Sequence, residues 1–125
     1  DTLFLSAVGR PDLEATPEGA GEKAHALFGS VRHLLDLPPR TVVLPGHTSE
    51  PVPFDREPIS APLSKVREKV GPLLEDEDRF VGKVAGGVSP TPENYERIVE
   101  LNRAGEQPEG DPTELEAGAN RCAAG

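Results

Sequence analysis

The sequence has few of the residues that build disulfide-stapled or aromatic cores. It contains one cysteine, no tryptophan and one tyrosine, and aromatic residues make up 4% of the chain. A single cysteine excludes an internal disulfide and a multi-cysteine zinc ribbon, so a reducing cytoplasm is the expected compartment. With so few aromatic side chains, any core must be small and mostly aliphatic.

Long apolar runs and an excess of positive charge are also missing. No segment approaches the roughly 18 apolar residues of a transmembrane helix, and no secretory leader pattern is present. The chain carries 13 basic and 22 acidic residues, for a net charge of -9. Because nucleic acids and anionic membranes are themselves negative, we expect neither as a partner.

Proline and glycine are abundant, with 14 and 13 copies among 125 residues. This content without a repeat is typical of short elements joined by many turns. We expect one domain at most, over residues 1–105, followed by a polar tail over residues 106–125. An apolar segment follows Asp1 directly, which favours a fragment whose upstream part is missing, although proteolytic maturation would give the same start.

Hydrophobic patterning predicts a strand, a helix and a strand in the first half of the chain. Residues 2–8 are a short apolar run bounded by turn residues, and predict a buried strand. Residues 22–37 place apolar side chains on one helical face before two prolines. Residues 41–44 predict a second buried strand. This order is typical of a βαβ-like or layered α/β (α+β) fold with one small sheet and flanking helices.

The second half of the chain predicts helices after a long loop. Residues 63–74 form a short helix interrupted by Gly-Pro, and residues 75–87 carry acids in a first turn and glycine at the end. The strongest helix prediction covers residues 89–105, where Thr91 is the expected N-cap and Gly105 is expected to end the helix.

Two residues at predicted strand ends can hold a metal ion. Asp1 stands before the first predicted strand, and His47 follows the second in the segment VVLPGH. Strand ends are rigid and their loops converge, so a carboxylate and an imidazole there can share one ion. An aspartate at a strand boundary is also a common turn residue, and that alternative stays open.

Arg10 lies in a turn whose backbone is fixed by Gly9 and Pro11. Its guanidinium can orient the nearby Asp12 or clamp the carboxylate of a substrate, and the alternative is a salt bridge that only stabilises the turn. Cys122 is either a reactive thiol, since its neighbour Arg121 favours the thiolate, or an inert one.

His25 and His33 both belong to the first predicted helix. They are about 12 Å apart along its axis, too far to share an ion. Both lie off the apolar face, so we expect them to be exposed surface residues.

Taken together, several segments resemble the C-terminal half of a metallo-β-lactamase-fold metalloprotein. The segments DTLFLSAVGRPDL, LLDLPPRTVVLPGH and NYERIVELNRAG follow one another in an order similar to the glyoxalase II and persulfide dioxygenase branch. The closing ANRCAAG is similar to the end of persulfide dioxygenases. The resemblance covers most of the chain and implies part of an αββα sandwich.

The resemblance also implies roles for individual residues. Asp1 would be a metal ligand, Arg10 would lie near a small, glutathione-derived substrate, and Asp12 would support the site. His47 would bind the second metal of the dinuclear hydrolases, or be retained without binding the metal in the mononuclear iron dioxygenases. The implied cofactor is iron or zinc, and the implied reaction is thioester hydrolysis or persulfide oxidation.

Two departures from that family limit the resemblance. The HxHxDH ligand loop is absent, so the isolated chain should be inactive, and a basic C-terminal patch that would favour glyoxalase II is absent as well. A second hypothesis is therefore a non-catalytic α/β interaction or regulatory module whose acidic surface binds a basic partner.

Overall fold

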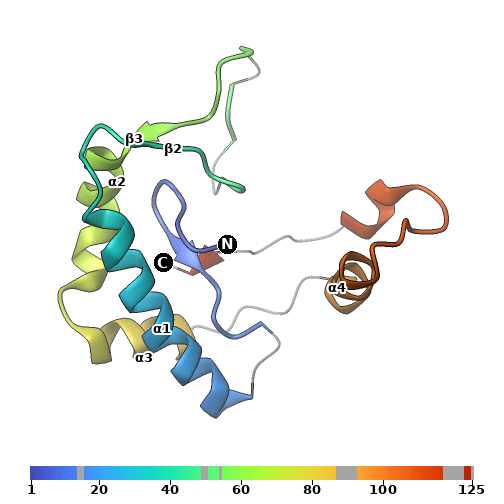
Figure 1. The fold of residues 1–125 in the computed structure, drawn as a ribbon, viewed down its shortest axis with the longest axis horizontal. Coiled ribbons are helices and arrows are strands. Elements are labelled where there is room, and N and C mark those ends of the chain that lie inside the picture. Colours follow the sequence, from blue (N-terminus) through green and yellow to red (C-terminus); the bar gives the residue numbers. More distant parts are fainter. Residues whose placement is uncertain (14–15, 49–50, 54, 87–92, 117–122, 125) are drawn as a thin grey trace. The chain divides into compact units, whose positions relative to one another are not determined.

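The computed structural model describes most of the chain (Figure 1). The described residues are 1–13, 16–48, 51–53, 55–86, 93–116 and 123–124. The chain forms two compact units, of which the first comprises Asp1–Val88 with Ala123–Gly125 and the second Ser89–Cys122. The domain boundary expected after residue 105 stays a prediction. The chain has a small α/β fold, with helices joined by very short strands.

Helix α1 spans Pro17–Leu35 and confirms the first predicted helix. It begins earlier than the apolar pattern indicates, because the Thr16 hydroxyl caps it by accepting the N–H of Gly19 at 3.1 Å and proline occupies the first turn. At its other end, the guanidinium of Arg67 donates to the carbonyl oxygen of Leu35. A cation at this position satisfies a helix-end carbonyl and complements the helix dipole.

The helices of the second half follow the predicted breaks. Helix α2 spans Leu63–Val70, the 3-10 helix η1 spans Gly71–Leu74, and α3 spans Glu77–Gly86. The change of helix type occurs at Gly71-Pro72, as expected where proline lacks an N–H donor. Asp76 caps α3 by accepting the N–H of Arg79 at 2.7 Å, and the acidic residues around it are exposed.

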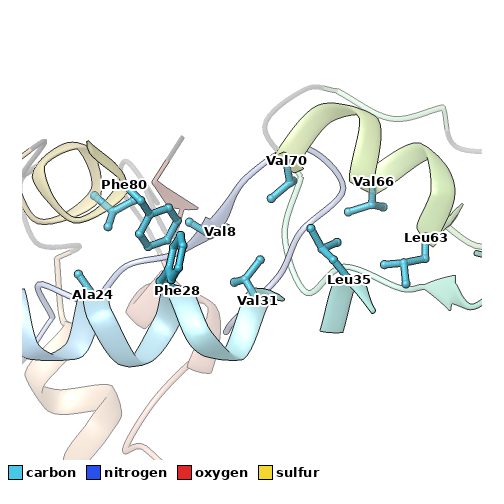
Figure 2. Close-up of a cluster of buried hydrophobic side chains, with 10 residues drawn as sticks. Val8, Ala24, Phe28, Val31, Leu35, Leu63, Val66, Val70 and Phe80 are labelled. Atoms are coloured by element: carbon cyan, nitrogen blue, oxygen red, sulfur yellow. The ribbon is translucent and has the colours of Figure 1, made fainter. Parts of the chain in front are cut away.

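One hydrophobic core joins α1 to α2 and α3 (Figure 2). The rings of Phe28 on α1 and Phe80 on α3 meet edge to face, with centroids 5.3 Å apart. Figure 2 shows Leu35 on α1 facing Leu63 and Val66 on α2. Each fully buried side chain of this kind contributes roughly 1.5–3 kcal/mol. The buried members of the core are Val8, Ala24, Phe28, Val31, Leu35, Leu63, Val66, Val70, Phe80 and Val84.

Residues 2–8 do not form the single buried strand that their apolar run predicts. Leu3 pairs antiparallel with Val8, and the N–H of Phe4 donates to the carbonyl of Ala7 at 2.9 Å. The segment is therefore a tight hairpin, which buries Phe4 and Val8 while its chain direction reverses. Only Val8–Gly9 form a strand, β1, which pairs antiparallel with β4, Ala123–Ala124.

The second predicted strand exists but is shorter and less buried than expected. Strand β2, Val42–Val43, pairs antiparallel with β3, Ala61–Pro62, immediately before α2. Val42 is 61% exposed and Leu44 is 69% exposed, so this segment was wrongly predicted to be buried. A two-stranded ribbon packed against one helix leaves its other face open to solvent.

The described strands form two separate two-stranded sheets, β1-β4 and β2-β3, where the sequence predicts one. Strands β1 and β2 flank α1 along the chain without sharing a sheet, so the βαβ-like arrangement is wrong. Helix α2 begins without a side-chain cap, and its first N–H donors are satisfied by carbonyls of Pro39 and Thr41 that precede β2. The β2-β3 ribbon is thus tied to α2.

The second unit contains α4, Tyr95–Ala104, and the 3-10 helix η2, Pro112–Glu116. Gly105 ends α4 in the left-handed conformation at φ 68°, as predicted from its position. The predicted cap, Thr91, lies outside the described residues, and Asn94 at φ 59° occupies the position before the helix. Its side-chain amide donates to the carbonyls of Glu114 and Leu115, which joins α4 to η2.

None of the helices in the described ranges is long and apolar enough to cross a membrane.

Candidate metal site

Asp1 and His47, for which the sequence predicts a shared metal site, lie in contact, and the metal itself stays a prediction. The Nε2 atom of His47 is 3.1 Å from Oδ2 of Asp1. Both side chains are partly open to solvent, with 41% of His47 and 44% of Asp1 exposed. The hairpin of residues 2–9 and the Pro-Gly-His turn after β2 bring the two side chains together, although β1 and β2 are in different sheets.

The spacing of these two atoms is that of a direct hydrogen bond or ion pair, and it is also compatible with two ligands of one ion. Nitrogen and oxygen ligands lie about 2.0–2.2 Å from zinc, so two ligands at a tetrahedral angle are about 3.3 Å apart and two at a right angle about 2.9 Å apart. The observed 3.1 Å falls between these values. A carboxylate and an imidazole are also ligands that zinc and ferrous iron share.

The ring of His47 is held from a second side by Phe4. The two ring centroids are 5.8 Å apart, and the planes meet at 61° in an edge-to-face contact. Phe4 is 4% exposed, so the hairpin fixes it firmly. The imidazole is therefore oriented by a buried ring and by the carboxylate that faces its Nε2 atom.

Among the described residues, no further histidine, cysteine, aspartate or glutamate completes a metal site with Asp1 and His47. Within those residues, no group of three or more histidine, cysteine, aspartate or glutamate side chains could hold a metal ion. A catalytic zinc has three protein ligands and an open position. The pair can therefore supply at most two ligands of such a site.

Arg10 and Asp12 form a partly buried ion pair with each other. The Nε atom of Arg10 donates to Oδ1 of Asp12 at 3.0 Å, and its Nη2 atom donates to Oδ2. Only 2% of the Arg10 side chain and 10% of the Asp12 side chain are exposed. The hydrogen bonds from Arg10 hold the pKa of the Asp12 carboxyl below its usual range, against the smaller opposing effect of burial.

This pairing corresponds to one of the alternatives that the sequence leaves open for Arg10. The bidentate geometry stabilises the turn after β1 and orients Asp12. In this conformation the guanidinium faces a carboxylate of its own chain. Its role toward a substrate stays a prediction.

The two histidines of α1 lie at the surface of the first unit. His25 and His33 are exposed, as predicted, and Nδ1 of His25 lies 2.8 Å from Oε1 of Glu77, which links α1 to α3 at the surface. Cys122 lies outside the described residues, so its proposed reactivity stays a prediction.

Sequence reasoning missed three residues around the site. The apolar pattern places Phe4 only in a strand, although an aromatic side chain near a strand end can orient an imidazole. The sequence indicates only turns at Gly9 and Gly46, and both lie against Asp1. For the two glycines a sequence signal exists: one directly precedes Arg10 and the other directly precedes His47. A glycine next to a candidate site residue can mark a position where another part of the chain approaches the backbone closely.

Comparison of the chain with protein-family models, curated proteins and solved structures gives no match in any of the three. The resemblance to the metallo-β-lactamase fold therefore stays a prediction from the motifs.

Proposed function

We propose that this chain contributes Asp1 and His47 to the metal centre of a metal-dependent enzyme of the metallo-β-lactamase superfamily. The observation that carries the proposal is the 3.1 Å contact between His47 Nε2 and Asp1 Oδ2. Since two ligands are too few for a catalytic ion, the remaining ligands would come from beyond the residues that the structure describes. The activity proposed for the complete enzyme is persulfide dioxygenase-like or thioester hydrolase-like.

In this proposal the residues of the chain have distinct tasks. Asp1 provides a negatively charged ligand, and His47 provides a neutral nitrogen ligand oriented by Phe4. The Arg10–Asp12 pair holds the turn that follows β1, directly beyond the hairpin that carries Asp1. When bound, a zinc or ferrous ion supplies Lewis-acid activation of water or substrate. The small substrate is proposed to be glutathione-derived, on the strength of the sequence resemblance.

A metal titration of the chain itself tests the proposal. Replacing His25 and His33 by Gln and Cys122 by Ser removes the other imidazoles and the only thiol, because the chain has three histidines and one cysteine. In this background, Zn²⁺ or anaerobic Fe²⁺ should shift the imidazole NMR signals of His47 in a saturable way. Binding should be weak, because only two protein ligands are present.

Asp1→Asn is the informative variant in that titration, because it preserves the size of the side chain and removes the charged ligand. We expect it to weaken binding at His47 by about tenfold or more. Glu57→Gln, which neutralises an exposed acid on the loop after the Pro-Gly-His turn, controls for the general attraction of cations to an acidic surface. Equal binding by Asp1→Asn and the parent background would contradict the proposal.

The competing proposal is a non-catalytic interaction or regulatory module. It is favoured by the first unit, whose hydrophobic core is formed between α1, α2 and α3. Among the described residues, no buried polar side-chain atom lacks a hydrogen-bond partner. This proposal predicts a cooperative thermal melt with no metal effect on the His47 signals. It also predicts that a basic partner binds in a salt-dependent manner, because the net charge is -9.

A further inference from the structure

Asp1 lies against two glycines that are far apart in the sequence. A Cβ atom added to Gly9 would lie 2.8 Å from the carbonyl carbon of Asp1 and would overlap its carbonyl oxygen. A Cβ atom added to Gly46 would lie 3.3 Å from Oδ1 of Asp1 and 4.0 Å from its Cγ atom. One glycine therefore borders the backbone of Asp1, and the other borders its carboxylate.

Neither glycine is required by an unusual backbone conformation. Among the described residues, the glycines with positive φ are Gly105 and Gly110. The property that matters at Gly9 and Gly46 is therefore the missing side chain, which allows another group to approach closely. The N–H of Gly9 also donates to the carbonyl of Thr2 at 3.0 Å, which fixes the residue that follows Asp1.

The two oxygens of the Asp1 carboxylate have different neighbours. Oδ2 faces Nε2 of His47 at 3.1 Å, whereas Oδ1 lies on the side of Gly46. Gly46 directly precedes His47 in the same turn. The Pro-Gly-His turn therefore supplies the imidazole of His47, and its glycine, Gly46, leaves room for the Asp1 carboxylate.

We infer that Gly9 and Gly46 are positioning residues that hold the Asp1 carboxylate opposite His47. Gly9 sets the place of the Asp1 backbone, and Gly46 sets the place of Oδ1. The functional meaning of this inference rests on the proposed metal site. Side chains at either position would weaken metal binding without contacting the ion.

The two positions should respond differently to substitution. Gly9→Ala forces the Asp1 backbone away, because the new Cβ atom cannot coexist with the Asp1 carbonyl group. Gly46→Ala brings a tight contact that a small movement of the carboxylate relieves, and Gly46→Val adds bulk at the same place. Gly29→Ala is the matched control, because a Cβ atom at this exposed position of α1 meets no described group within 4 Å.

The first readout needs no metal. The ¹³C signal of the Asp1 carboxyl group should respond when His47 is replaced by Gln, because the two groups are in contact. This response should persist in Gly29→Ala, decrease in Gly46→Val and disappear in Gly9→Ala. Gly46 is exposed in a surface turn, so Gly46→Val gives a decisive result even if Gly9→Ala fails to fold.

The second readout is Zn²⁺ affinity at His47 in the background that lacks the other histidines and the cysteine. Gly9→Ala should weaken binding about tenfold or more, and adding Asp1→Asn to it should cause no further loss. An unchanged Asp1 response in both Gly9→Ala and Gly46→Val overturns the inference, whether or not zinc binds. If the response is lost as expected but no variant binds zinc, the positioning role stands and the proposed function fails.

Discussion

The guanidinium of Arg10 and the carboxylate of Asp12 face each other through two hydrogen bonds in the turn after β1, and both side chains are nearly buried. Removing one partner of such a pair leaves an uncompensated buried charge. The turn also follows the hairpin that carries Asp1, so the pair stabilises the segment on which the candidate site is built.

Arg10→Ala should therefore destabilise the first unit by about 1–3 kcal/mol, measured as the free energy of unfolding in urea. Replacing both residues, Arg10→Leu with Asp12→Leu, should cost clearly less, because neither member of the pair is left facing the place of a missing opposite charge. A single Arg10→Ala variant as stable as the parent would contradict the buried pairing.

The same pair predicts a dependence of stability on pH. The Asp12 pKa is lowered in the folded chain by Arg10, whereas an unfolded aspartate titrates at about 3.9. The unfolded state therefore binds the proton more readily, and the stabilisation is present above about pH 4 and lost as the pH falls through the folded pKa.

Urea unfolding of the parent chain and of Asp12→Asn at pH 7, 5 and 3 measures this effect. The parent should be the more stable of the two at pH 7 and 5, and the difference should shrink at pH 3. The comparison isolates Asp12 from the other acidic residues, which titrate in both proteins. If the stability difference between the parent and Asp12→Asn instead grows as the pH falls, folding does not lower the pKa of Asp12.

Phe4 should matter both for the core and for the imidazole of His47. Phe4→Ala removes a buried ring and should cost about 3–5 kcal/mol of folding free energy. Phe4→Leu keeps an apolar side chain at this place but removes the edge-to-face contact with His47. We expect the ring-proton signals of His47 to shift in Phe4→Leu, because they lose the ring current of Phe4. Unshifted signals would mean that the two rings are not in contact.

The surface pair of His25 and Glu77 should contribute little to stability. Its atoms are 2.8 Å apart, but the two side chains are 51% and 49% exposed. Solvent screens exposed pairs, so His25→Gln should change the unfolding free energy by less than about 0.5 kcal/mol. This small cost also justifies His25→Gln in the metal titrations. A loss of more than 1.5 kcal/mol would require a larger role for the contact between α1 and α3 at this point.

The helices were predictable from local signals, because each signal acts within one or two turns. The apolar spacing of α1, the Gly71-Pro72 break and the Gly105 stop all depend on neighbours in sequence. The strands were not predictable in the same way. An apolar run such as residues 2–8 is compatible with an extended strand or with a hairpin, and only its tertiary partners decide between them.

The contact between Asp1 and His47 was predicted for a partly wrong reason. We expected the ends of two strands in one sheet to converge, but β1 and β2 lie in different sheets and the hairpin brings Asp1 to the Pro-Gly-His turn. The glycines beside Asp1 could not be assigned from sequence, because a close approach depends on the placement of residues that are distant in the chain.

The central claim is that Asp1 and His47 face a shared metal ion, and a crystal of the chain soaked in Zn²⁺ tests it most directly. Anomalous diffraction should show zinc within about 2.2 Å of both His47 Nε2 and Asp1 Oδ2, and Asp1→Asn should lose that peak. Zinc bound only elsewhere on the chain, with the imidazole and carboxylate still in direct contact, would contradict the account.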